Sequence, residues 1–185
     1  HRHTSSSVVA IEILIARILK VKKIIVHSHN NSSKHKIINK IFRPILNLCA
    51  NYKFACSEDA AKWLFGKKHY KEVKIIYNGI NLQNFLYNEE IRKKIRTQFN
   101  IKDNIVIGHI GRFEYQKNHK FIINIFSELL KNNKKYELWL IGDGKLKEEI
   151  EDYIGSKKIK EHVKLFGIVD NVNELLQGMD IFIFP

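Results

Sequence analysis

At 185 residues, 44% of them hydrophobic, the chain is long enough to bury a substantial core and too apolar to be intrinsically disordered. Two cysteines are too few for a disulfide scaffold, and no Cys/His spacing matches a zinc site, which fits a reducing cytoplasm. No run approaches the ~18–20 apolar residues of a membrane span, and the first residues lack a signal-peptide pattern.

The net charge of +13 is unevenly distributed along the chain. Residues 1–80 hold 15 Lys/Arg against 4 Asp/Glu, whereas residues 81–185 hold 17 against 15. This asymmetry indicates a basic face for an anionic partner, either a phospholipid surface or a nucleic acid, unless it is only a solvated basic surface. Because residue 1 is not Met and the last residues form an uncapped apolar run, we expect a segment of a longer protein.

Residues 1–80 alternate short strands with helices. The polar cluster at residues 4–7 precedes a helix that is apolar on most of its circumference, which we expect to be buried on two sides. The strand at 24–27 runs into a loop with two histidines, and ligands collect beyond the carboxyl ends of such strands. A helix from about 34 to 51, a strand at 52–56, a helix capped by Ser57 and ended by Gly66, and a strand at 73–77 complete the repeated βα pattern.

Residues 81–103 have little periodicity and then a charged helix, so they are the candidate connection between two domains. From residue 104 the βα alternation restarts, with strands predicted at 105–110, 137–141, 163–166 and 180–184 and helices between them. The fold class is therefore α/β, with two Rossmann-like doubly wound domains, both incomplete in this segment. Residues 1–80 form the second half of one and residues 104–185 the first part of the other, with a ligand cleft expected between them.

The stretch at 108–118, GHIGRFEYQKN, lies between a buried strand and a predicted helix start. A glycine turn followed by Arg112 and Lys117 could hold a diphosphate, because free amide groups at a helix start and two cations attract an anion. The alternative is an ordinary loop with solvated charges. No G-x-G-x-x-G or G-x-x-x-x-G-K-[ST] string occurs, which disfavours dinucleotide oxidoreductases and P-loop NTPases.

Six motifs in order carry a resemblance to a known family. They are HSHN, FACSEDAAKWLFG, IIYNGINLQNF, IGHIGRFEYQKNHKFIINIF, LWLIGDGKL and VKLFGIVDNVNELLQGMDIFIFP. Together they resemble the retaining GT-B glycosyltransferases of family 4 (glycosyl transferases group 1), in particular the bacterial enzymes that build exopolysaccharide, capsule or lipopolysaccharide. Each motif alone is weak, but the resemblance covers essentially the whole chain.

The resemblance implies roles for individual residues. Arg112 and Lys117 match the basic pair that holds the diphosphate of the donor, with the backbone of Gly111 beside it. The loop at 168–171 matches the one that reads the nucleobase, which points to Val169 and Asn171. In the first domain, His27 matches a histidine near the reacting sugar, and His29 and Asn30 line the acceptor side, so His27 and His29 are the expected catalytic residues.

The implied reaction moves a sugar, a hexose in the expected case, from a nucleotide-sugar with UDP as the leaving group to a glycan or lipid-linked acceptor. The anomeric configuration is retained through front-face departure and attack. No cofactor and no metal are expected. The family's glutamate motif would lie beyond Pro185 and its early glycine-rich loop before His1, so residues 1–185 alone are expected to be inactive. The protein is expected to be cytoplasmic, with a possible peripheral place at the anionic inner face of the membrane.

The sequence leaves two other hypotheses about function open. A basic nucleic-acid-binding module would explain the charge of residues 1–80, but no RNP aromatic pattern, GXXG clamp or zinc knuckle occurs in those residues, so no nucleic-acid partner is expected. A noncatalytic remnant of an enzyme is compatible with every residue of the segment.

Overall fold

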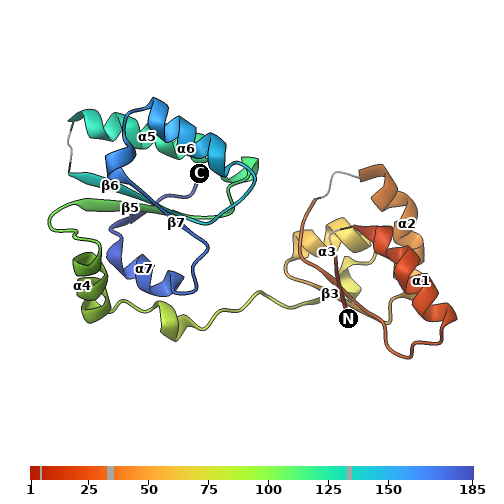
Figure 1. The fold of residues 1–185 in the computed structure, drawn as a ribbon. Coiled ribbons are helices and arrows are strands. Elements are labelled where there is room, and N and C mark those ends of the chain that lie inside the picture. The colour runs from red at the N-terminus through yellow and green to blue at the C-terminus, as the bar shows by residue number, and fades with distance from the viewer. Residues whose placement is uncertain (5, 33–35, 133–134) are drawn as a thin grey trace. The chain divides into compact units, whose positions relative to one another are not determined.

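The computed structural model describes residues 1–4, 6–32, 36–132 and 135–185, and these form two compact units, His1–Ile80 and Asn81–Pro185 (Figure 1). Each unit contains a parallel four-stranded sheet whose strands alternate with helices. The predicted α/β class with two Rossmann-like sheets is therefore confirmed. Residues 81–103, expected as a connection between domains, belong to the second unit.

The first unit has its strands in chain order across the sheet. They are β1 (Arg2–Thr4), β2 (Ile25–Ser28), β3 (Tyr52–Ala55) and β4 (Lys74–Ile75), joined by α1 (Ala10–Ile18), α2 (Lys36–Cys49) and α3 (Glu58–Phe65), with 3-10 turns at Ser7–Val9 and Tyr70–Glu72. Right-handed crossovers between consecutive parallel strands place all three helices on one face of the sheet. The expected start of the second helix, at residue 34, lies outside the described residues.

The capping residues read from the sequence act as predicted on α3. The Ser57 hydroxyl accepts a hydrogen bond from the Ala60 amide at 3.2 Å, which satisfies one of the free amides of the first turn. Glu58 and Asp59 lie in that turn and complement the positive end of the helix dipole. Gly66 ends the helix at φ +88°, a conformation that favours glycine.

The prediction that the first helix is buried on two sides is wrong, because one side of α1 is exposed. Ala10 and Ile13 of α1 are buried, but Ile15 and Ile18 are 51% and 71% exposed. The main contacts of α1 within its unit are with α2 and the 3-10 turn before it. Helical periodicity shows which residues are apolar, but only the neighbouring elements decide how many of those faces are covered.

The second unit has the strand order β7-β6-β5-β8, again parallel. Its helices cover both faces of the sheet, with α5 and α6 on one and α4 and α7 on the other, as Figure 1 shows. One core cluster centres on Phe113 and Phe126, and another on Ile95 and Trp139. The elements are α4 (Glu89–Gln98), β5 (Ile105–Ile110), α5 (His119–Asn132), β6 (Tyr136–Ile141), α6 (Lys147–Ser156), β7 (Val163–Gly167), α7 (Val172–Gly178) and β8 (Ile181–Phe182), with 3-10 turns at Leu82–Phe85, Tyr115–Lys117 and Lys160–His162.

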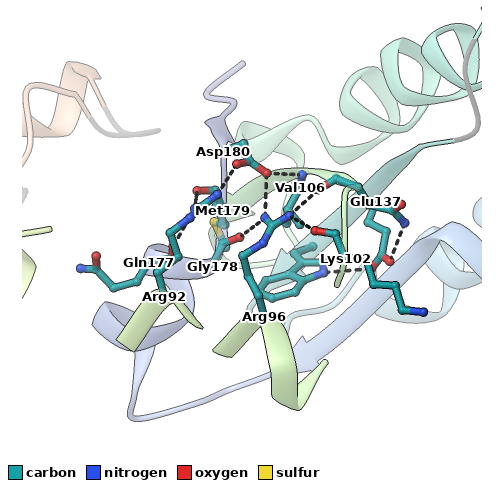
Figure 2. Close-up of polar contacts among 11 residues, drawn as sticks. Arg92, Arg96, Lys102, Val106, Glu137, Gln177, Gly178, Met179 and Asp180 are labelled. Carbon is teal, nitrogen blue, oxygen red and sulfur yellow. Dashed lines mark hydrogen bonds and ion pairs between the residues drawn. The ribbon is translucent and has the colours of Figure 1, made fainter. Parts of the chain in front are cut away.

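Helix α4 is attached to this unit through a network of charged groups around Asp180 (Figure 2). Arg92 and Arg96 donate to the Asp180 carboxylate at 2.5 and 3.0 Å, and the Val106 amide donates to it at 2.8 Å. Arg92 also donates to the carbonyls of Gln177 and Met179, both at 2.9 Å. These bonds hold the charged helix against the end of α7 and the start of β8, which explains why it belongs to the second unit.

No helix within the described ranges is long and apolar enough to cross a membrane.

Candidate functional site

Three glycines lie where parallel strands of the second unit end. Gly111 follows β5, Gly142 follows β6, and Gly167 is the last residue of β7. The Gly111 amide donates to the Ile141 carbonyl at 2.9 Å, and the Gly142 amide donates to the Gly167 carbonyl at 2.8 Å. The carboxyl ends of three neighbouring strands are thus tied together, which is where open α/β sheets bind ligands.

The close approach of these strand ends requires glycine at position 142. Gly142 has φ +137°, and a Cβ atom there would lie 2.1 Å from the Gly111 carbonyl oxygen. A Cβ atom at Gly144 would lie 2.6 to 2.9 Å from backbone atoms of Phe113. The backbone of the loop after β6 therefore packs directly against the backbone of the loop after β5. Main-chain groups of both loops lie together at the ends of these strands.

A cavity of about 700 Å³ opens at these strand ends. Of the residues expected to bind the donor, Gly111, Arg112 and Val169 line it, and Lys117 and Asn171 do not. Asp143 and Lys145 also line it and were not predicted, although the Gly-x-Gly string after a buried strand was a usable signal. The remaining lining residues are Ile110, Ile141, Gly142, Gly144, Gly167, Ile168 and Val172.

Arg112 and Lys117 both follow Gly111 in the chain, but their side chains lie in different surroundings. The Arg112 side chain is exposed and makes no ion pair or hydrogen bond with any described residue. The aliphatic part of Lys117 packs beside Gly111, 3.1 to 3.2 Å from where a Cβ atom would lie, and its ammonium group is 4.8 Å from the centre of the Phe184 ring. The side chain facing the cavity thus carries a positive charge that no carboxylate of the described chain neutralises.

The loop at 168–171 follows β7 directly. Ile168 is 84% exposed, and Val169 is half-buried against the core that includes Trp139. Asn171 precedes α7, and its carbonyl accepts from the Glu174 and Leu175 amides at 3.0 and 3.2 Å. Its backbone is thus engaged in starting the helix, while Ile168 and Val169 present an apolar wall to the cavity.

Two buried histidines flank the loop between β5 and α5, and they were not predicted as site residues. His109 and His119 have ring centroids 5.0 Å apart, and they are 0% and 3% exposed. The Nδ1–H of His109 donates to the Ile183 carbonyl at 2.9 Å, whereas its Nε2 has no partner among the described residues. Burial lowers the pKa of His109 and lowers that of His119 to about 4, so both rings are neutral at pH 7.

His27 and His29 lie in the first unit, at the end of β2. His27 is buried, and its ring centroid is 4.1 Å from that of His29. Burial lowers the pKa of His27, and the neighbouring rings of His29 and His3 lower it further. The structure also brings His1 and His3 to this place, which the sequence did not indicate, although the repeated H-x-H string at 1–3 and 27–29 was an available signal.

A protein-family model described as glycosyl transferases group 1 matches residues 91–185. EpsF of Bacillus subtilis (strain 168), which is named as a glycosyltransferase, is 31% identical over 194 residues, covering 100% of this chain and 50% of EpsF. An N-acetylgalactosaminyltransferase of Campylobacter jejuni, whose name specifies a diphospho-undecaprenol-linked acceptor, is 29% identical over 114 residues, covering 62% of this chain and 28% of that protein. The chain spans about half the length, or less, of these relatives.

Among solved structures, HepE of Anabaena in complex with UDP-glucose superposes with a TM-score of 0.79 at 18% identity, covering 97% of this chain and 51% of HepE. At this identity the likeness shows the fold, and it extends over both units of the chain.

Proposed function

The chain belongs to the glycosyl transferases group 1 family and has the GT-B type of fold, and from this premise we propose that it takes part in transferring a sugar from a UDP-linked donor. The acceptor we propose is a glycan or a lipid-linked glycan of the cell surface, by analogy with the named acceptor of the Campylobacter relative. The observation that carries the proposal is the cavity at the ends of β5, β6 and β7, with an unneutralised arginine in its wall.

In this proposal the diphosphate lies at Gly111 and Arg112, because the guanidinium of Arg112 is free to form a bidentate bond with phosphate oxygens. Lys117 packs beside Gly111 and supplies a second cation at the edge of the site. Two cations held in place neutralise the negative charge that builds on the leaving UDP as the bond to the sugar breaks. The base is placed against Val169 and the exposed apolar side chain of Ile168, with Asn171 at the end of that loop.

For the reacting sugar we propose retention of anomeric configuration, with a hexose as the group transferred and no metal in the transfer step. His27 and His29 are proposed to contact the sugar and the acceptor. Residues 1–80 are proposed as part of the acceptor domain and residues 104–185 as part of the donor domain. Residues 81–103, which pack with the second unit, are proposed as the connection that leads into it. Because the chain spans only half of EpsF, we propose that it binds UDP but does not transfer sugar by itself.

The test is UDP binding to the 185-residue chain, measured by calorimetry, with uridine as the comparison ligand. Arg112→Ala and Lys117→Ala should each weaken UDP binding by about 10- to 100-fold and leave uridine binding unchanged, because each removes a charge-assisted contact to phosphate. In a longer chain with activity, each should lower turnover on the order of 10²-fold. Lys131→Ala is the matched control, because this exposed lysine lies outside the cavity and, among the described residues, pairs only with Glu128 of its own helix.

Unchanged UDP affinity in both variants would contradict the diphosphate site. An equal loss in Lys131→Ala would show that binding follows the overall charge and not the cavity. Sugar transfer by the 185-residue chain would contradict the proposal that it is inactive alone.

We also propose a peripheral place at an anionic membrane surface on the cytoplasmic side. The first unit carries the excess of Lys and Arg, and its helices α1 and α2 expose apolar side chains, among them Ile18, Ile37 and Leu48 at 71 to 80%. Basic residues near an anionic surface contribute roughly 1 kcal/mol each. The chain should float with vesicles that contain anionic lipid and not with neutral ones, and Leu48→Asp should reduce flotation; equal flotation with both vesicle types would contradict the idea.

A further inference from the structure

Four histidines, His1, His3, His27 and His29, form one cluster on the sheet of the first unit, which we call the histidine cluster. Strands β1 and β2 pair in parallel with His3 opposite His27. Side chains alternate between the two faces of a strand, so His1, His3 and His27 project from one face. Val26 projects from the other face, into the core beneath the helices. The cluster therefore lies on the face of the sheet opposite α1, α2 and α3.

The imidazole ring of His27 is buried, but its nitrogens form no hydrogen bonds with the described residues. It is 6% exposed, and neither of its ring nitrogens has a hydrogen-bond partner among the residues that the structure describes. Its surroundings are the other rings of the cluster and Phe54, whose ring stands edge-on at 5.9 Å. No carboxylate of the described chain bonds to any of the four imidazoles. A buried polar group normally has a partner, so two orphaned nitrogens at this place indicate a ligand.

The nitrogen atoms are grouped closely enough for a metal ion. One ring nitrogen each from His1, His3 and His27 can be chosen so that all three lie within 4.8 Å of one another. In a tetrahedral zinc site, nitrogens at about 2.0–2.1 Å from the ion lie ~3.4 Å apart. The nitrogens can move from within 4.8 Å to this shorter spacing if the side chains of His1 and His3 rotate. Both of these side chains are exposed, and only that of His27 is buried.

The fourth histidine occupies the position of a supporting group. His29 Nε2 lies 2.5 Å from His3 Nδ1, so one nitrogen of His3 is engaged there and the other is free to bind an ion. Metal-binding histidines commonly have their second nitrogen fixed in this way, which sets the orientation of the ring. Three imidazoles without a carboxylate favour zinc, copper or nickel over magnesium and calcium, which prefer oxygen ligands.

We propose that the first unit binds one Zn²⁺ ion through His1, His3 and His27, with His29 orienting His3. Three protein ligands leave a fourth coordination position for water or another small ligand. All four histidines belong to the first unit. His27 and His29 are also the residues proposed to contact the sugar and the acceptor, so a bound ion and those substrates would compete for the same side chains; the proposed transfer step itself uses no metal. A bound ion would link β1 to β2 and so stabilise the first unit when zinc is present.

The experiment is titration of Zn²⁺ into the 185-residue chain with its α-amine acetylated, because a free α-amine can itself chelate a metal. Calorimetry should show saturable binding of one ion per chain, and Co²⁺, used as a spectroscopic probe, should give the absorption of a four-coordinate site. His3→Ala and His27→Ala should each weaken binding by at least about tenfold, and His29→Ala by about tenfold. His69→Ala is the matched control, because His69 is an exposed histidine of the same unit, outside the cluster.

His3 is exposed, so His3→Ala should fold normally, and circular dichroism checks this for each variant. The absence of saturable binding would overturn the proposal. Binding by His3→Ala and His27→Ala that equals the wild-type value would also overturn it, as would an equal loss in His69→Ala.

Discussion

Replacement of Gly142 by alanine tests how closely the two cavity loops approach. The added methyl group would lie 2.1 Å from the carbonyl oxygen and 2.9 Å from the carbonyl carbon of Gly111. Both are backbone atoms, so no side-chain rotation can relieve the overlap, and the strand ends must separate. The φ angle of +137° is also one that residues with a Cβ atom rarely adopt.

The expected loss of stability follows from these two effects. A strained backbone conformation costs of order 1–3 kcal/mol. Forcing an extra methyl group into a packed place costs about 1–3 kcal/mol more. The unfolding free energy of the second unit should therefore fall by roughly 2–6 kcal/mol, which in a unit of this size lowers Tm by about 10 °C or more. UDP affinity should fall as well, because the displaced atoms belong to the wall of the cavity.

Urea unfolding followed by tryptophan fluorescence measures the change, because Trp139 is fully buried in the second unit. Gly155→Ala is the matched control: no atom lies within 4 Å of its added methyl group, and the residue is in helix α6. That control should gain about 0.5–1 kcal/mol from the higher helix propensity of alanine. If Gly142→Ala unfolds at the wild-type urea concentration and binds UDP with wild-type affinity, the inferred packing of the two loops is wrong.

Three further predictions concern groups outside the cavity wall. Asp180→Ala should destabilise the second unit by about 2–4 kcal/mol in urea unfolding, because two guanidinium groups and the Val106 amide lose their acceptor. Asn39→Ala should cost the first unit about 2–3 kcal/mol by the same measurement, because this fully buried amide accepts from Ser7 N–H at 2.6 Å and donates to the Trp63 carbonyl at 3.1 Å. Lowering the pH from 6.5 to 4 should destabilise the second unit by up to about 3 kcal/mol through His119. Burial lowers the pKa of His119 in the folded state from 6.5 to about 4, so the unfolded chain binds a proton at a higher pH than the folded chain does.

Each of these predictions has a control variant or an outcome that would contradict it. Asp152→Ala removes an exposed carboxylate that makes no ion pair with the described residues, so a loss equal to that of Asp180→Ala would contradict the role of the network. For Asn39, a wild-type midpoint would show that the buried bonds add nothing to stability. The pH effect should vanish above about pH 7.5, where His119 is neutral in both states, and it should be smaller in His119→Phe. An unchanged slope in that variant would contradict the assignment.

Much of the fold could be read from local patterns. The Ser57 cap and the Gly66 end each depend on neighbouring residues, and both features are present as predicted. The stretch at 108–118 was read as a strand end followed by a helix start, and β5 ends at Ile110 while α5 begins at His119. Gly111 and Arg112 could be selected for the same reason, since their place just after a buried strand is a local property.

The sequence by itself determined the α/β class, the two regions of βα alternation and the glycine loops at strand ends, because periodicity, caps and turns are short-range properties. Only the tertiary structure decided which loops meet. Gly142 and Gly144 come to face Gly111 and Phe113 through the parallel pairing of β5 with β6. The same kind of pairing brings His3 beside His27 in the first unit, and the Asp180 network assigns α4 to the second. Strand register and packing bring together residues that are far apart in the chain. The spacing of residues within one segment does not predict these long-range contacts.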